Sequence, residues 1–214
     1  MLTLIRREIR DHVVYFFAAV IFAVIIMSMS LSVISEFKTL YRGIDKLMSH
    51  LRIVIAITSI VIFGFFAMGA AQMYTDKNRR ISAFLSTLPV SRSRILIARM
   101  LTGVLAILAL LVPLAIVPII LIRIFMPPIP QLSGVVFEVF TGMFLTAFAC
   151  YCIGLQAGWN SSSLVPAMGG LGLAIILVSL ILVKGFGLHI FVILILFIAA
   201  SLIRIWHLFT STSL

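Results

Sequence analysis

The chain has 214 residues and a formal net charge of +10, and 63% of its residues are hydrophobic while only 10% are charged. Ordinary soluble domains are about 45–50% apolar and about 25% charged, so this composition argues against a soluble enzyme and against intrinsic disorder. The Lys and Arg residues stand between long apolar runs, which is typical of a membrane protein rather than of a nucleic-acid-binding protein. We therefore expect the lipid bilayer, and no nucleic acid, as a partner.

Residues 1–12 are predicted to form an amphipathic helix. Leu2, Ile5 and Ile9 share one face of such a helix, and arginines occupy much of the remainder. This pattern is typical of a helix that lies in the membrane interface. Two interpretations stay open: a flanking anchor, or an elbow helix that positions the first span against a partner. The residues that define this helix are Ile5, Arg6, Arg7, Ile9 and Arg10.

Six apolar stretches are long enough to cross a bilayer, which requires about 20 residues in helical form. They cover residues 13–34, 53–73, 100–122, 139–159, 164–183 and 185–203. The excess of Lys and Arg near the span ends falls on the side that includes the N-terminus, which the positive-inside rule makes cytoplasmic. We therefore predict an all-α polytopic protein of a bacterial-type cytoplasmic membrane, with six transmembrane helices and both termini in the cytoplasm.

The segment 36–52, between the first two spans, is predicted to form an outer amphipathic helix. Apolar residues such as Phe37, Leu40, Ile44 and Leu47 recur at helical spacing, and charged residues fill the opposite side. A surface helix on the bilayer is the simpler interpretation. A gate over an exit path is the alternative, and the role of this helix stays open.

The segment 74–99 carries the most specific pattern. Ile81, Phe84, Leu85 and Leu88 recur at helical spacing, and Pro89 ends that short helix. A serine hydroxyl, from Ser91 or Ser93, could then cap the third span. Arginines flank the short helix on both sides: Arg79, Arg80, Arg92 and Arg94. Such a helix could lie on anionic lipid or dock into a groove on a cytosolic partner.

The fourth span, 139–159, carries small residues at steps of four. They are Gly142, Thr146, Cys150, Gly154 and Gly158. Small residues in one row let another helix approach closely in a membrane. The row therefore predicts a helix-packing surface, either within this chain or at a dimer interface.

These features together resemble the permease subunits of the ABC-2 type exporter family. The residues that carry the resemblance are Asp76, Lys77, Arg79 and Arg80, then Phe84 and Leu85, then Leu88-Pro89-Val90-Ser91-Arg92, with Arg99 opening the third span. The amphipathic elbow helix and the six spans match the layout of the family. The acidic residue is Asp76, where the family commonly has glutamate.

The resemblance implies a function and a set of partners. In the family this loop includes a coupling helix that contacts an ATP-binding subunit. The residues implied in that contact are Asp76, Arg79, Arg80, Ile81, Phe84, Leu85, Leu88, Pro89, Ser91 and Arg92. Two copies of the ATP-binding subunit, which carry ATP and Mg²⁺, and a second permease chain, the same or different, would complete an exporter.

The chemistry of the sequence fits a chain that is not itself an enzyme. It contains no G-x-x-x-x-G-K-S/T loop and no H-E-x-x-H motif, so we expect no nucleotide, cofactor or metal on this chain. The spans hold no fixed charge that would receive an ion, so an amphipathic or hydrophobic substrate is expected. Glu138 is the one acid that could lie in a span, and it sits at an outer end, which disfavours a secondary carrier. A non-transporting scaffold or assembly factor is the main alternative.

Overall fold

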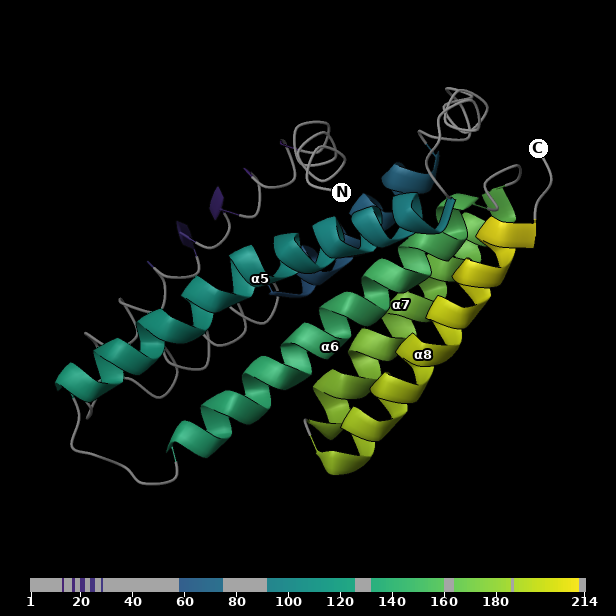
Figure 1. Ribbon diagram of the computed structural model, residues 1–214. Helices are drawn as coiled ribbons and strands as arrows, with labels where there is room; N and C mark the ends of the chain where they lie inside the picture. Colours follow the sequence, from purple (N-terminus) through teal and green to yellow (C-terminus); the bar gives the residue numbers. More distant parts are fainter. Residues whose placement is uncertain are drawn as a thin grey trace.

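The computed structural model describes residues 58–74, 92–125, 132–159, 164–185 and 187–211, together with single positions between 13 and 28. Its elements are the helix Thr58–Tyr74, α5 (Arg92–Phe125), α6 (Leu132–Trp159), α7 (Leu164–Lys184) and α8 (Leu188–Ser211) (Figure 1). The single positions between Val13 and Ser28 are also helical. The all-helical prediction is confirmed for these residues, while the predicted helices 1–12 and 36–52 lie outside them.

Three of the described helices are long and apolar enough to cross a membrane. The qualifying segments are Ser93–Pro113, Phe137–Trp159 and Leu188–Leu208. Two further apolar helical segments, Thr58–Tyr74 and Met168–Lys184, are shorter. These are the properties of a membrane-embedded protein.

The helices extend beyond the apolar stretches that predicted them. α5 begins at Arg92 rather than at residue 100, α6 begins at Leu132 rather than at 139, and α8 continues to Ser211 rather than ending at 203. α5 has 34 residues, which at a rise of 1.5 Å per residue is about 51 Å, against a hydrocarbon core of about 30 Å. An apolar run corresponds to the part of a helix that lies in hydrocarbon. The helix itself is longer, because its backbone hydrogen bonds continue into the membrane interface.

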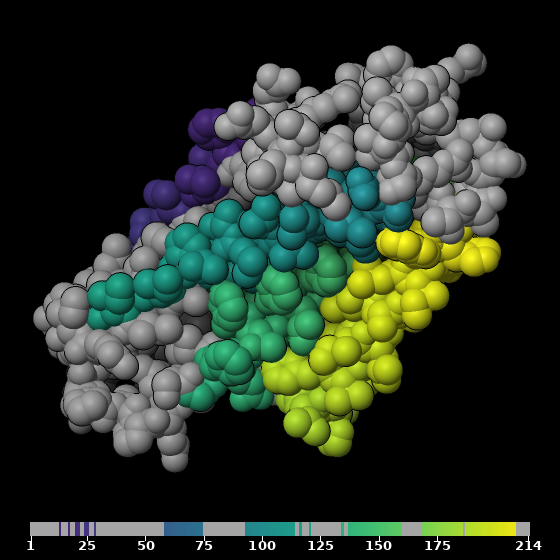
Figure 2. Space-filling view, viewed as in Figure 1, coloured from purple at the N-terminus to yellow at the C-terminus, as the bar shows by residue number. Residues whose placement is uncertain are grey.

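The central element of the bundle is α6, which packs against α5, α7 and α8. Figure 1 shows that helices consecutive in the chain run in opposite directions, so α6 and α8 run parallel to each other. The start of α5, the end of α6 and the end of α8 therefore lie at one end of the bundle. Figure 2 shows α5, α6 and α8 side by side across one face. The connections 126–131 and 160–163 are short, as antiparallel neighbours in a helix bundle require.

The side chains of α6 are more deeply buried than those of α7 and α8. Residues 149–155 of α6 are all buried, and Cys150, Tyr151, Cys152 and Leu155 expose none of their surface. By contrast, α7 and α8 expose large apolar side chains such as Val183 (84% exposed). In a bilayer such apolar faces contact lipid, so they carry no penalty there.

A tight turn joins α7 to α8. Gly185 has φ +74° and donates its N–H to the Ile181 carbonyl at 2.8 Å, which is the αL form of helix ending. The Gly187 carbonyl then accepts the first hydrogen bonds of α8, from Ile190 (2.9 Å) and Phe191 (3.1 Å). Glycine at position 185 allows the left-handed backbone that reverses the chain.

The substitution Gly185→Ala should therefore destabilise the α7–α8 turn. A residue with a Cβ pays about 1–2 kcal/mol in the left-handed region. Thermal unfolding of the purified chain in detergent measures the effect. Gly172→Ala is the matched control, since Gly172 lies inside α7 with nothing within 4 Å of an added Cβ. Equal melting temperatures for the two variants would contradict this account of the turn.

Candidate functional site

The predicted coupling segment connects two helices that the structure describes. The predicted range of this segment is 74–99. The helix Thr58–Tyr74 ends at the start of that range, but α5 already begins at Arg92, so the part that lies between the two helices is 75–91. Outside the described residues lie Asp76, Arg79, Arg80, Ile81, Phe84, Leu85, Leu88, Pro89 and Ser91 of this segment, and Ile5, Arg6, Arg7, Ile9 and Arg10 of the predicted elbow helix. The candidate site is therefore built from the helices that hold the two ends of the segment.

Three buried polar side chains meet where these two helices contact α6. They are Gln72 of the helix Thr58–Tyr74, Arg99 of α5 and Tyr151 of α6, and we call them the polar cluster. Gln72 and Arg99 are each 2% exposed and Tyr151 is 0% exposed. Gln72 stands in the last turn of its helix and Arg99 in the second turn of α5, so the polar cluster lies close to both ends of the segment 75–91.

Tyr151 links the other two helices by its hydroxyl group. Its oxygen lies 2.6 Å from Gln72 Oε1 and 3.0 Å from the Arg99 carbonyl oxygen. A phenol has one hydrogen and donates it to one oxygen at a time, and 2.6 Å is a usual distance for O–H···O. The Gln72 oxygen is therefore the main acceptor. The Gln72 amide nitrogen is buried and has no hydrogen-bond partner among the described residues.

Arg99 lies inside the bundle, close to the predicted start of the third span. Its Nη1 atom donates to the Met73 sulfur at 3.6 Å, and its side chain is 2% exposed. The physical reason is that α5 starts seven positions before Arg99, at Arg92, so this residue falls on a buried turn of a helix. The next turn carries Thr102, whose hydroxyl bonds the Ala98 carbonyl at 2.9 Å within the same helix.

Two glycines create the space that Tyr151 occupies. A Cβ added at Gly103 of α5 would collide with the Tyr151 ring and hydroxyl. A Cβ added at Gly69 would collide with the backbone of α6 at Tyr151 and Leu155. The tyrosine thus sits between two helices that each offer a glycine, so the ring fits only while both helices stay in this register.

The small-residue row of α6 faces the helix Thr58–Tyr74 over part of its length. A Cβ at Gly154 would meet the Phe66 carbonyl, and one at Gly158 would meet the Ala70 carbonyl. This is the close backbone approach that small residues allow between membrane helices. Within the described residues, this half of the row makes contacts inside the chain.

The rest of the row is also buried. Cys150 packs with apolar side chains that include Ile62 and Phe66, and its thiol is free, as is that of Cys152. Thr146 donates its hydroxyl hydrogen to the Gly142 carbonyl at 2.7 Å, within α6. Gln156 reaches the other side of α6, where its amide donates to the Ser201 carbonyl of α8 at 3.3 Å.

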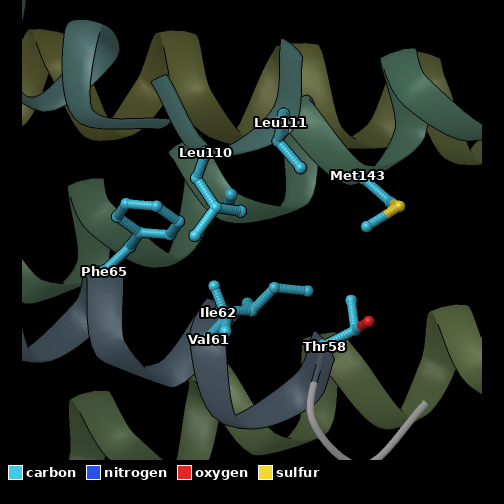
Figure 3. A pocket seen from close by; sticks show the side chains of 8 residues that line it. Thr58, Val61, Ile62, Phe65, Leu110, Leu111 and Met143 are labelled. Atoms are coloured by element: carbon cyan, nitrogen blue, oxygen red, sulfur yellow. The ribbon is translucent and has the colours of Figure 1, made fainter. Parts of the chain in front are cut away.

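A small apolar cavity lies between the helix Thr58–Tyr74, α5 and α6, farther from the segment 75–91 than the polar cluster is (Figure 3). Its lining residues are Thr58, Val61, Ile62, Phe65, Leu110, Leu111, Met143 and Ala147. Its volume is about 10 Å³, close to the lower limit for one water molecule. This cavity is a packing gap and is too small for a substrate.

The sequence did not identify the polar cluster. From the sequence alone, Gln72 and Tyr151 carry no assigned role, and Arg99 stands at the start of the third span. The available signal was an amide and a phenol inside two apolar spans and a guanidinium directly before a third, where buried polar groups need partners. Which of them meet depends on the register between helices.

The arrangement is suited to holding helices together. The polar cluster offers hydrogen-bond donors and acceptors from three helices, and no three His, Cys, Asp or Glu side chains among the described residues come close enough to hold a metal ion. Comparisons with known proteins add no assignment: no family model, curated protein or solved structure matches this chain.

Proposed function

We propose that this chain is the membrane-spanning permease subunit of an ATP-driven ABC exporter in a cytoplasmic membrane. Two ATP-binding subunits hydrolyse ATP and bind the segment 75–91, and a second permease chain, the same or different, completes the path. The observation that carries the proposal is the position of that segment. It joins two helices that the polar cluster ties to α6, and it bears the Leu88-Pro89-Val90-Ser91-Arg92 motif.

The mechanical argument concerns how a movement reaches the spans. A cytosolic subunit that pulls on a short helix moves the spans only if the connection is stiff. Here the Tyr151 hydroxyl lies within hydrogen-bonding distance of Gln72 Oε1 and of the Arg99 carbonyl oxygen, close to the two ends of the segment. ATP-driven closure of the partner would then tilt the helices as rigid bodies rather than deform a loop.

The end of the bundle near this segment has the composition of a cytoplasmic interface. Exposed Arg94 and Arg204 lie towards this end, and so do the aromatic residues Tyr74, Trp159 and Trp206. Basic residues are enriched on the cytoplasmic side of membranes, and Tyr and Trp at both interfaces. This supports the orientation in which the segment 75–91 meets a cytosolic partner.

The substrate class follows from the faces that the described helices present. α5 exposes apolar side chains along most of its length, such as Ile97, Leu105 and Ile116. The charged group buried among the described residues is Arg99, near the cytoplasmic end. A path along such surfaces suits an amphipathic or hydrophobic molecule rather than a small ion.

The substitutions Phe84→Glu and Leu88→Glu test this proposal directly. They place carboxylates on the apolar face of the predicted coupling helix, which should remove the ATP-binding subunit from the purified complex or abolish the stimulation of its ATPase. Lys77→Glu is a matched control, because it adds an acid to the same segment at a position outside the apolar face. Full binding and stimulation in the double variant would contradict the proposal and favour the scaffold.

A further inference from the structure

We propose that Tyr151 is a positioning residue that fixes the register between the helix Thr58–Tyr74 and α5, and so transmits movement of the segment 75–91 to α6. The inference deepens the proposed function and rests on it. It assigns to one buried phenol the connection between the site of ATP-driven movement and the centre of the membrane bundle.

The geometry makes Tyr151 the shared contact of both helices. Its hydroxyl oxygen lies 2.6 Å from Gln72 Oε1 and 3.0 Å from the Arg99 carbonyl oxygen. Its ring fills the space left by Gly103, and its own backbone carbonyl lies against Gly69. A shift of the helix Thr58–Tyr74 along α6 moves Gly69 away from the Tyr151 carbonyl and lengthens the Gln72 contact, and a shift of α5 moves Gly103 away from the Tyr151 ring.

The chemistry of Gln72 indicates more than a packing role. Its amide nitrogen is buried and has no hydrogen-bond acceptor among the described residues. The amide is explained by its bond to Tyr151, which gives the helix end a directional contact that an apolar residue cannot supply.

The substitution Tyr151→Phe isolates the hydroxyl group while the ring still fills its space. The variant should assemble with the ATP-binding subunit in lipid nanodiscs as the wild-type chain does. Its stimulation of ATP hydrolysis should fall about tenfold, the change that the loss of one well-formed hydrogen bond accounts for. Tyr74→Phe is the matched control, since it removes an exposed hydroxyl from the same end of the bundle. Unchanged stimulation in Tyr151→Phe would overturn the inference.

The substitution Gln72→Met separates positioning from stability. A purely structural role predicts that stability and stimulation fall together. Our proposal predicts that stimulation of the ATPase falls more than the melting temperature does, because Met fills the volume of the Gln72 side chain but offers no acceptor to the Tyr151 hydroxyl. Normal stimulation of the ATPase in both Gln72→Met and Tyr151→Phe would overturn the proposal and show that the polar cluster contributes only to helix packing.

A distance measurement tests the register without any partner protein. Spin labels at Ala67→Cys and Arg94→Cys, both exposed, report the separation of the two helices, while the native cysteines are buried in α6. The Tyr151→Phe chain alone should give a broader distance distribution than wild type. A distribution of unchanged width would overturn the positioning role, even if no ATP-binding subunit exists. A broader distribution in a chain that binds no such subunit would leave the register role intact and reject the proposed function.

Discussion

The substitution Gly154→Ala should force the helix Thr58–Tyr74 away from α6. The added Cβ would lie against the Phe66 carbonyl and close to the Ala70 nitrogen, which are backbone atoms that move only if a whole helix moves. Overpacking of this kind costs about 1–3 kcal/mol. Gly158→Ala, against the Ala70 carbonyl, should have a similar effect. The measurement is thermal or SDS-induced unfolding of the purified chain in mild detergent.

Glycines in open space provide the controls for this prediction. Gly64 lies on the same helix as Phe66, and Gly134 lies near the start of α6, and an added Cβ at either position meets nothing within 4 Å. Alanine favours a helix by up to about 1 kcal/mol over glycine, so Gly64→Ala and Gly134→Ala should leave stability equal or higher. The predicted packing is wrong if Gly154→Ala is as stable as these two controls.

The substitution Tyr151→Ala should be the most destabilising change at the polar cluster. Removing a fully buried aromatic side chain leaves a cavity between three helices, and such truncations cost about 3–5 kcal/mol. The change also removes the hydrogen of the 2.6 Å contact with Gln72 Oε1. Tyr151→Phe, which keeps the ring, should lose only about 0.5–1.5 kcal/mol. The same unfolding assay compares the two variants.

Tyr74→Ala is the control for the truncation of Tyr151. Tyr74 is 51% exposed, and substitutions at exposed sites usually change stability by no more than about 0.5 kcal/mol. A loss in Tyr151→Ala no larger than in Tyr74→Ala would show that the ring does not fill the space between Gly69 and Gly103.

The helical architecture followed from the sequence because apolar run length is a direct consequence of bilayer thickness. The run 139–159 ends at the same residue as α6, Trp159, and the run 164–183 matches α7 (Leu164–Lys184) to within one residue. α5 and α6 begin before the apolar runs 100–122 and 139–159, because polar residues such as Arg92 and Ser93 are as compatible with a helix in the interface as with a loop. The continuation of α5 past Pro113 and Pro118 follows the tolerance of membrane helices for proline.

The candidate site was less accessible to sequence reasoning. Gly154 and Gly158 were identified because a row of small residues has a fixed period along one helix. The polar cluster has no such period, since Tyr151 meets residues 79 and 52 positions away in the chain. Contacts of this kind depend on the rotation and register of three helices against each other, which a single sequence does not determine.

Purification of the tagged chain from its own host in mild detergent, with mass spectrometry of the proteins that accompany it, tests the central claim most directly. An ATP-driven permease should bring with it a stoichiometric protein that carries a phosphate-binding loop, and the ratio of the two would give the subunit composition. Recovery of this chain alone, in crosslinked membranes as well as in detergent, would contradict the permease assignment and favour the scaffold.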